Sequence, residues 1–144
     1  MTNKIFAGPA GAEPILTEAL TVAAFLPGTL LEQPAAGFSA TNNASTTFGN
    51  AFIVAKEQAT TLGGGINTLT VVGDTTEAIL PKTGEYVYLR MAVANLTAKS
   101  VALASNGNGQ FKIAALGGTE QVFAYTEEII NVTVAGTLVL CRAA

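Results

Sequence analysis

The sequence contains no histidine and no tryptophan, and it has a single aspartate, Asp74. Without histidine, the chain lacks the commonest general base and near-neutral proton carrier. Neither a nucleophile elbow nor a Ser-x-x-Lys signature is present. One aspartate and dispersed glutamates also form no calcium loop. We therefore expect a protein that is not an enzyme, with no catalytic residue, no metal site and no cofactor.

Cysteine occurs once, at Cys141. An intrachain disulfide and a thiolate metal site are both excluded by that count. Because Cys141 lies near the end of the last expected strand, we predict that it packs as a small buried hydrophobic residue.

Charged residues make up 12% of the chain, about half the usual share, and the net charge is −3. The seven basic residues form no cluster, so we expect neither nucleic acid nor a membrane surface as a partner. A surface with few charges suits a protein that is docked on a partner, because few ions lose their hydration. A threonine-rich extracellular β-domain would have the same composition.

The apolar segment 15–26 is interrupted by Glu18 and followed by Pro27-Gly28. It is too short for a membrane-spanning helix and makes a poor signal peptide. We expect a soluble chain made in a cytoplasm.

Short apolar runs separated by Gly, Pro and Asn predict an all-β fold, either a small β-barrel or a sandwich-like single domain. The strongest strand is 85–94, in which Val87, Leu89, Met91 and Val93 should point into the core. Asn106-Gly107 predicts a tight hairpin. Further strands are expected at 29–32, 52–58, 66–72, 101–104, 110–114, 121–126 and 131–140, with a short edge piece at 78–81.

Residues 16–25 are ambiguous, because their apolar positions match a helical face and alternate poorly as a strand. The β-branched Thr17, Thr21 and Val22 favour a strand. Pro27-Gly28 then predicts a turn, with 29–32 as the returning strand.

Residues 1–14 are predicted to form a flexible, extended N-terminal arm, and 15–144 the β-rich domain. Glycine and proline at 8–11 and Pro14 disfavour regular structure in the arm. Lys4-Ile5-Phe6 is a short apolar anchor within it. Such an arm is either disordered or adds a strand to the sheet edge of a neighbouring chain.

The segment 34–50 is long for a loop in a compact domain, and its residues are small and uncharged. This composition suits close contact with another protein. Tyrosines on the 85–94 strand should lie half-exposed or at an interface. The candidate interface residues are Phe38, Asn42, Asn43, Tyr86 and Tyr88.

Residues 27–57 resemble residues 99–127, at an offset of roughly 70. Each segment has a short apolar strand, a glycine with a phenylalanine (Phe38 or Phe111), a loop, and a strand that ends in glutamate (Glu57 or Glu127). The pattern indicates either two copies of one β-unit in a single domain or a chance similarity of β-turn sequences. As a carboxylate pair across a cleft, Glu57 and Glu127 would suit glycoside hydrolysis, but we favour structural roles at strand ends.

The chain resembles the small decoration, or cement, proteins of tailed-bacteriophage heads. The resemblance extends over most of the chain and rests on the arm and on four segments: Pro27-Gly28-Thr29-Leu30-Leu31, Ala55-Lys56-Glu57, Gly84-Glu85-Tyr86-Val87 and Gly136-Thr137-Leu138-Val139-Leu140.

The resemblance implies a structural virion protein, made in the host cytoplasm and located on the capsid surface. It implies a homotrimer that binds the major capsid protein where capsid subunits meet, and so stabilises the shell. In such proteins the arm commonly extends a capsid sheet, a role that would belong here to Thr2, Asn3, Lys4, Ile5 and Phe6. The alternative is another virion surface module, such as a head fibre, a tail component or a glycan-binding β-domain, with Tyr86, Tyr88 and Tyr125 around a shallow pocket.

Overall fold

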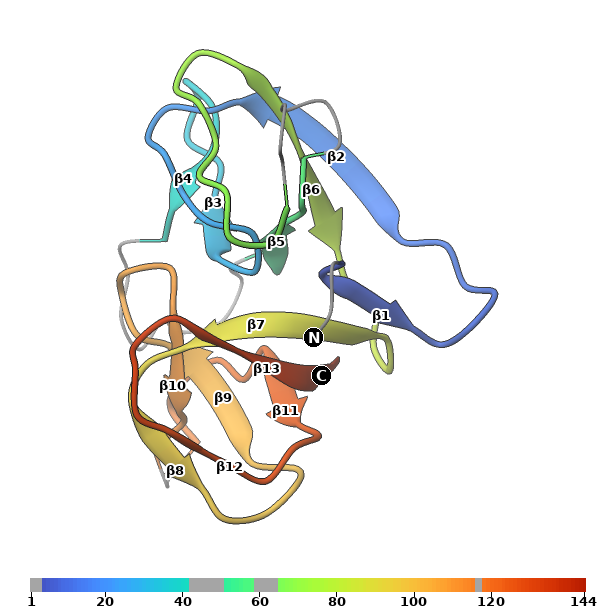
Figure 1. The fold of residues 1–144 in the computed structure, drawn as a ribbon, viewed down its shortest axis with the longest axis vertical. Helices are drawn as coiled ribbons and strands as arrows, with labels where there is room; N and C mark the ends of the chain where they lie inside the picture. Colours follow the sequence, from blue (N-terminus) through green and yellow to red (C-terminus); the bar gives the residue numbers. More distant parts are fainter. Residues whose placement is uncertain (1–3, 42–50, 59–64, 116–117) are drawn as a thin grey trace.

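A computed structural model of the chain describes residues 4–41, 51–58, 65–115 and 118–144. These residues form thirteen strands and no helix, which confirms the all-β prediction (Figure 1). The first six strands are β1 (Phe6–Gly8), β2 (Ile15–Leu20), β3 (Leu30–Glu32), β4 (Ser39–Ala40), β5 (Ile53–Ala55) and β6 (Thr75–Leu80). The other seven are β7 (Tyr86–Met91), β8 (Ala94–Leu96), β9 (Ala102–Ser105), β10 (Phe111–Ile113), β11 (Ala124–Thr126), β12 (Ile130–Val132) and β13 (Thr137–Ala143).

The strands divide into two lobes, one above the other in Figure 1. The C-terminal lobe contains a closed five-stranded barrel, which we call the C-terminal barrel, in the order β7-β10-β9-β11-β13. It closes because β13 pairs with β7 over six residue pairs, from Thr137↔Met91 to Arg142↔Tyr86. On its other side β7 pairs with β10 in parallel, through Phe111↔Met91. β8 and β12 form a separate ribbon.

The N-terminal lobe is a five-stranded sheet, which we call the N-terminal sheet, in the order β2-β6-β5-β3-β4. Its two end strands meet through a parallel bridge between Thr21 and Phe38. There the Phe38 amide donates to the Leu20 carbonyl at 2.7 Å, and the Val22 amide donates to the Phe38 carbonyl at 2.9 Å. This sheet therefore also curls round on itself.

The two lobes have the same strand order. Numbered along the chain, the strands β2, β3, β4, β5 and β6 correspond to β7, β9, β10, β11 and β13. In both sets the second strand lies between the third and the fourth, and the fifth pairs with the first. The parallel contact between first and third strands is Thr21–Phe38 in one set and Met91–Phe111 in the other, at offsets close to 70. The similarity predicted between 27–57 and 99–127 is thus confirmed as a repeated topology.

One apolar cluster extends through both lobes. It joins Leu30, Val54 and Ile79 of the N-terminal sheet to the interior of the C-terminal barrel, including Leu89 and Phe111. A second cluster around Phe38 fills the inside of the N-terminal sheet. Because the larger cluster is continuous, the two lobes form one folded unit.

The strand prediction at 85–94 is confirmed by β7, in which Val87, Leu89 and Met91 are fully buried. Val93 is exposed instead, because the strand ends at Met91. The hairpin is confirmed, since β9 and β10 pair from Ser105↔Phe111 onward, but residues 106–110 connect the strands, so the predicted tight turn at Asn106-Gly107 is not formed. Gly107 in this connection has a φ of 89°, the left-handed conformation that favours glycine.

Other strand predictions are wrong. Residues 66–72 form no strand, because 68–71 are irregular and lie between turns at 66–67 and 72–73. Residues 78–81 are not an edge piece, because β6 lies between β2 and β5. β3 does not return beside β2, since the two are at different places in the sheet. Residues 131–140 belong to two strands, β12 and β13, separated by a turn that contains Gly136.

The prediction of a separable N-terminal arm is wrong for residues 5–8. Ile5 is fully buried in the larger apolar cluster. β1 pairs antiparallel with β7, with Phe6 opposite Val87, and the Tyr88 amide donates to the Ile5 carbonyl at 2.9 Å. The Ile5 amide donates to the Glu57 carboxylate at 2.9 Å. The anchor therefore adds a strand to the sheet of its own chain.

Candidate interaction surface

Large aliphatic side chains are exposed at many positions of the described chain, with exposed fractions of 43% to 69%. They occur along β2 and in the irregular segment 69–72 of the N-terminal lobe, and singly on the C-terminal lobe. The residues are Ile15, Leu16, Leu20, Val22, Leu69, Val71, Val72, Val93, Ile113, Ile129 and Val134. A surface of this kind is typical of a protein that contacts another macromolecule.

The predicted interface residues lie in different places. Phe38 is wrong as an interface residue, because its side chain is fully buried inside the N-terminal sheet. Tyr86 and Tyr88 are half-buried on β7, as expected for tyrosines at the edge of a core. Asn42 and Asn43 lie outside the described residues.

Among the predicted arm residues that the structure describes, Lys4 is exposed, Phe6 is half-buried and Ile5 is buried. The backbone of Ile5 and Phe6 is paired with β7 of the same chain, and their role in extending a capsid sheet stays a prediction. Thr2 and Asn3 lie outside the described residues.

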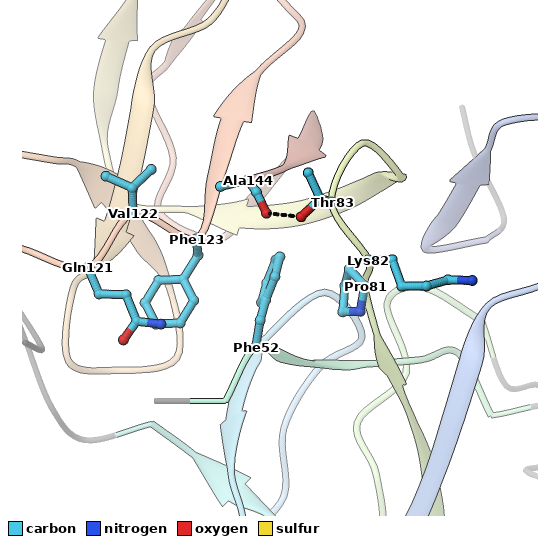
Figure 2. A pocket seen from close by; sticks show the side chains of 8 residues that line it. All are labelled: Phe52, Pro81, Lys82, Thr83, Gln121, Val122, Phe123 and Ala144. Atoms are coloured by element: carbon cyan, nitrogen blue, oxygen red, sulfur yellow. Dashed lines mark hydrogen bonds between the residues drawn. The ribbon is translucent and has the colours of Figure 1, made fainter. Parts of the chain in front are cut away.

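A hollow of about 570 Å³ opens between the two lobes (Figure 2). Its floor is formed by the rings of Phe52, which precedes β5, and Phe123, which precedes β11; their centroids are 5.5 Å apart. On the rim, the Thr83 hydroxyl donates to the Ala144 carbonyl at 3.0 Å. Figure 2 shows the Lys82 side chain extending away from the two rings. The hollow thus offers aromatic carbon for packing, with one ammonium group at its margin.

A second hollow, of about 690 Å³, lies beside Arg90. It is lined by Ile66, Asn67, Tyr88, Arg90, Glu128, Thr137 and Leu138. The Glu128 carboxylate accepts a hydrogen bond from the Leu140 amide at 3.2 Å. This hollow combines one tyrosine with several polar side chains.

The buried Arg90 guanidinium connects both lobes. Its Nε donates to the Pro27 carbonyl at 2.8 Å, one terminal nitrogen donates to the Gly136 carbonyl at 2.8 Å, and the other donates to the Ile66 carbonyl and the Asn67 side chain. All these acceptors are neutral oxygens. Burial accordingly lowers the pKa of Arg90, because no carboxylate among these partners offsets the lost hydration. Since its hydrogen bonds are used within the chain, Arg90 is a structural tie.

The two glutamates at matching positions of the repeat have separate structural roles. Glu57 accepts the hydrogen bond from the Ile5 amide. Glu127 forms an ion pair with Arg142 at 3.3 Å, and its amide donates to the Leu140 carbonyl. This agrees with the structural roles favoured from the sequence.

Cys141 is fully buried in the C-terminal barrel, as predicted. Burial raises the pKa of its thiol well above the ordinary range, and the nearby Glu128 and Glu127 carboxylates raise it further. The native state therefore keeps this proton at pH values where the unfolded chain loses it.

This shift predicts a pH dependence of stability. The contribution is complete below the unfolded thiol pKa of about 8.5, and it decreases as the pH rises further. Between pH 8 and 9.5 the free energy of unfolding should fall by about 1 kcal/mol more in the wild type than in Cys141→Ala. Urea titrations of both proteins at the two pH values test this. An equal fall in the free energy of unfolding in the wild type and in Cys141→Ala would contradict it.

Within the described ranges, no group of three or more Cys, Asp or Glu side chains gathers as metal ligands would. No helix in that part of the chain has the length and apolar character needed to cross a membrane. A scan against models of protein families and a search of curated proteins found no match for this chain.

Sequence reasoning did not single out the outward face of β2. The signal was present, since apolar residues at both odd and even positions of 15–22 are what an edge strand with an apolar outer face would show. Arg90 was placed on the correct strand, but its carbonyl partners come from residues 24 to 63 positions away in sequence.

Proposed function

We propose that this chain is a structural decoration protein of a tailed-phage head, which binds the outer surface of the shell where major capsid subunits meet. The observation that carries the proposal is the exposed aliphatic surface, with most of its residues on β2 and in the irregular segment 69–72. In a chain with half the usual content of charged residues, such a surface can be covered by a partner at little cost in lost ion hydration.

Two further features support this role. The repeated topology gives a small, rigid module whose two lobes share one apolar core. In this proposal the module binds its partner without a cofactor. The resemblance to cement proteins adds the expected partner, the major capsid protein, and a homotrimer on the virion surface. A trimer would multiply weak single contacts through effective concentration.

The proposal predicts that the protein stabilises the shell. Empty heads from the phage that carries this gene, stripped of bound decoration protein, should rupture at a higher temperature once the purified chain is added, because a ligand that binds only the intact shell stabilises it by mass action. The readout is the rupture temperature measured by light scattering across a protein titration. An unchanged rupture temperature at saturating protein would contradict a cement role.

The hollow beside Arg90 favours a second candidate, a glycan-binding virion module. Tyr88 offers a ring for a sugar face, while Asn67, Glu128 and Thr137 offer polar groups at the same hollow. If this function holds, a glycan array should show saturable binding that is lost in Tyr88→Ala and kept in Tyr125→Ala, because Tyr125 does not line this hollow. Equal loss in both variants, or no binding, would contradict it.

A further inference from the structure

The outer edge of β2 carries backbone groups that no described residue satisfies. The Thr21 amide donates to the Asp74 carbonyl on the β6 side, whereas the Leu20 carbonyl accepts from Phe38 on the opposite side. Since residues in a strand alternate in direction, the N–H and C=O groups of Leu16 and Glu18 also point away from β6. No strand in the described part of the chain pairs with β2 there.

The side chains beside this edge form an apolar stripe with one charge. Thr17 and Ala19 lie opposite buried residues of β6 and face the inside of the sheet. The alternate residues lie on the other face, where Leu16 is opposite the buried Ile79, and Leu16 and Leu20 are 45% and 51% exposed, on either side of the exposed Glu18. Edge strands are usually protected by lysine, proline or a bulge. β2 has no lysine, no proline and no bulge, Glu18 is its single charged residue, and it pairs with β6 in an unbroken register.

The repeated topology shows what fits at such an edge. β7 is the counterpart of β2, and its free edge is covered antiparallel by β1, with the Tyr88 amide donating to the Ile5 carbonyl. At the offset of 70 given by Thr21 and Met91, Tyr86 and Tyr88 correspond to Leu16 and Glu18. The two outward-facing residues of β2 are thus at the positions that β1 covers on β7.

Charge decides between a second copy and a different partner. Two antiparallel registers pair the free outward groups of Glu18 with those of another β2, one centred on residue 17 and the other on residue 18. In these registers the two Glu18 carboxylates face each other diagonally or directly, and β2 carries no cation. Like charges opposite each other destabilise a strand pair, whereas opposite charges stabilise it.

We propose that the β2 edge binds an extended segment of a different protein as an added antiparallel strand. The segment carries Lys or Arg opposite Glu18 and an aliphatic residue opposite Leu16, and its pairing ends before Leu20, whose carbonyl already accepts from the Phe38 amide. The assignment of this segment to the major capsid protein rests on the proposed function.

The test uses a variant that removes only the outward hydrogen bond. Because the Glu18 N–H points away from β6, Glu18→Pro should leave the ladder to β6 in place. The control, Thr17→Pro, removes an N–H that faces β6 and should destabilise the fold. Glu18→Gln keeps the N–H and removes the charge. Urea unfolding of the variants checks the orientation of the strand independently.

The probe is a nine-residue peptide of threonine with lysine at its centre and valine two positions to either side. Titrated into the full chain, it should shift the Leu16 and Glu18 amide signals saturably in a two-dimensional NMR spectrum. A glutamate-centred peptide should bind about 5-fold more weakly. Glu18→Pro should bind the lysine peptide at least about 10-fold more weakly than the wild type does. Glu18→Gln should bind the two peptides with equal affinity. No saturable shift in the wild type, or wild-type binding by Glu18→Pro, would overturn the proposal.

Co-sedimentation with empty heads separates the two proposals. Head binding by the wild type that is lost in Glu18→Pro supports both. Head binding retained in Glu18→Pro overturns the β2 edge as the capsid contact and leaves the decoration function standing. Peptide binding without any head binding supports the β2 edge and overturns the capsid partner.

Discussion

Replacing Arg90 by leucine is expected to lower the free energy of unfolding by about 3 kcal/mol. The substitution leaves the carbonyls of Pro27 and Ile66 buried without their donor, and each unsatisfied buried group costs about 1–3 kcal/mol. It also releases the Gly136 carbonyl in the C-terminal lobe. Because these acceptors belong to both lobes, the loss should weaken the whole unit and lower the urea midpoint.

Two controls separate the role of Arg90 from the loss of a charge. Arg142→Leu removes a half-exposed arginine paired with Glu127, and such pairs contribute under about 1 kcal/mol. Arg90→Lys keeps the charge but lacks the planar guanidinium that reaches several carbonyls. Its loss of stability should therefore lie between the losses of Arg142→Leu and Arg90→Leu. If Arg90→Leu and Arg142→Leu were equally stable, Arg90 would not be the tie between the lobes.

Truncating Ile5 to alanine should be almost as damaging, with a loss of about 3 kcal/mol. Its side chain is fully buried in the cluster that joins the lobes, and such truncations cost about 2–5 kcal/mol. Deleting residues 1–8 should cost more, because β1 and the hydrogen bond to Glu57 are lost as well. Thermal or urea unfolding measures both variants.

Ile15→Ala is the matched control, because it is the same truncation on a residue that is 45% exposed. Its loss should stay within about 1 kcal/mol. A chain without residues 1–8 that unfolded at the wild-type midpoint would restore the separable arm and contradict the pairing of β1 with β7.

The parts of the fold that could be predicted are those determined by neighbouring residues. β7 was recognised because aliphatic and polar residues alternate within it, and the β9–β10 hairpin because Asn106-Gly107 indicates a turn between two strands. For β6 the sequence predicts only a short edge piece, because its residues, TTEAIL, do not form the continuous apolar run expected of a central strand. Only the pairing with β2 and β5 makes it a strand.

The N-terminal anchor shows what local sequence does not contain. Glycine and proline at 8–11 correctly indicate an irregular segment, yet Ile5 and Phe6 before it are held by β7, which is about 80 residues away in sequence. Of the candidate interface residues, Phe38 is buried in the core. The sequence does not predict this, because a phenylalanine in a long loop gives no sign of whether it packs inward. Tyr86 and Tyr88 were placed at the correct depth by the alternation of β7.

Co-sedimentation of the purified chain with empty heads tests the central claim, that this protein works by binding a shell through its uncharged surface. The account predicts saturable binding, with a number of copies per head set by the repeat of the capsid lattice. A chain that stays in the supernatant at every concentration, while the same heads bind another decoration protein, would contradict it.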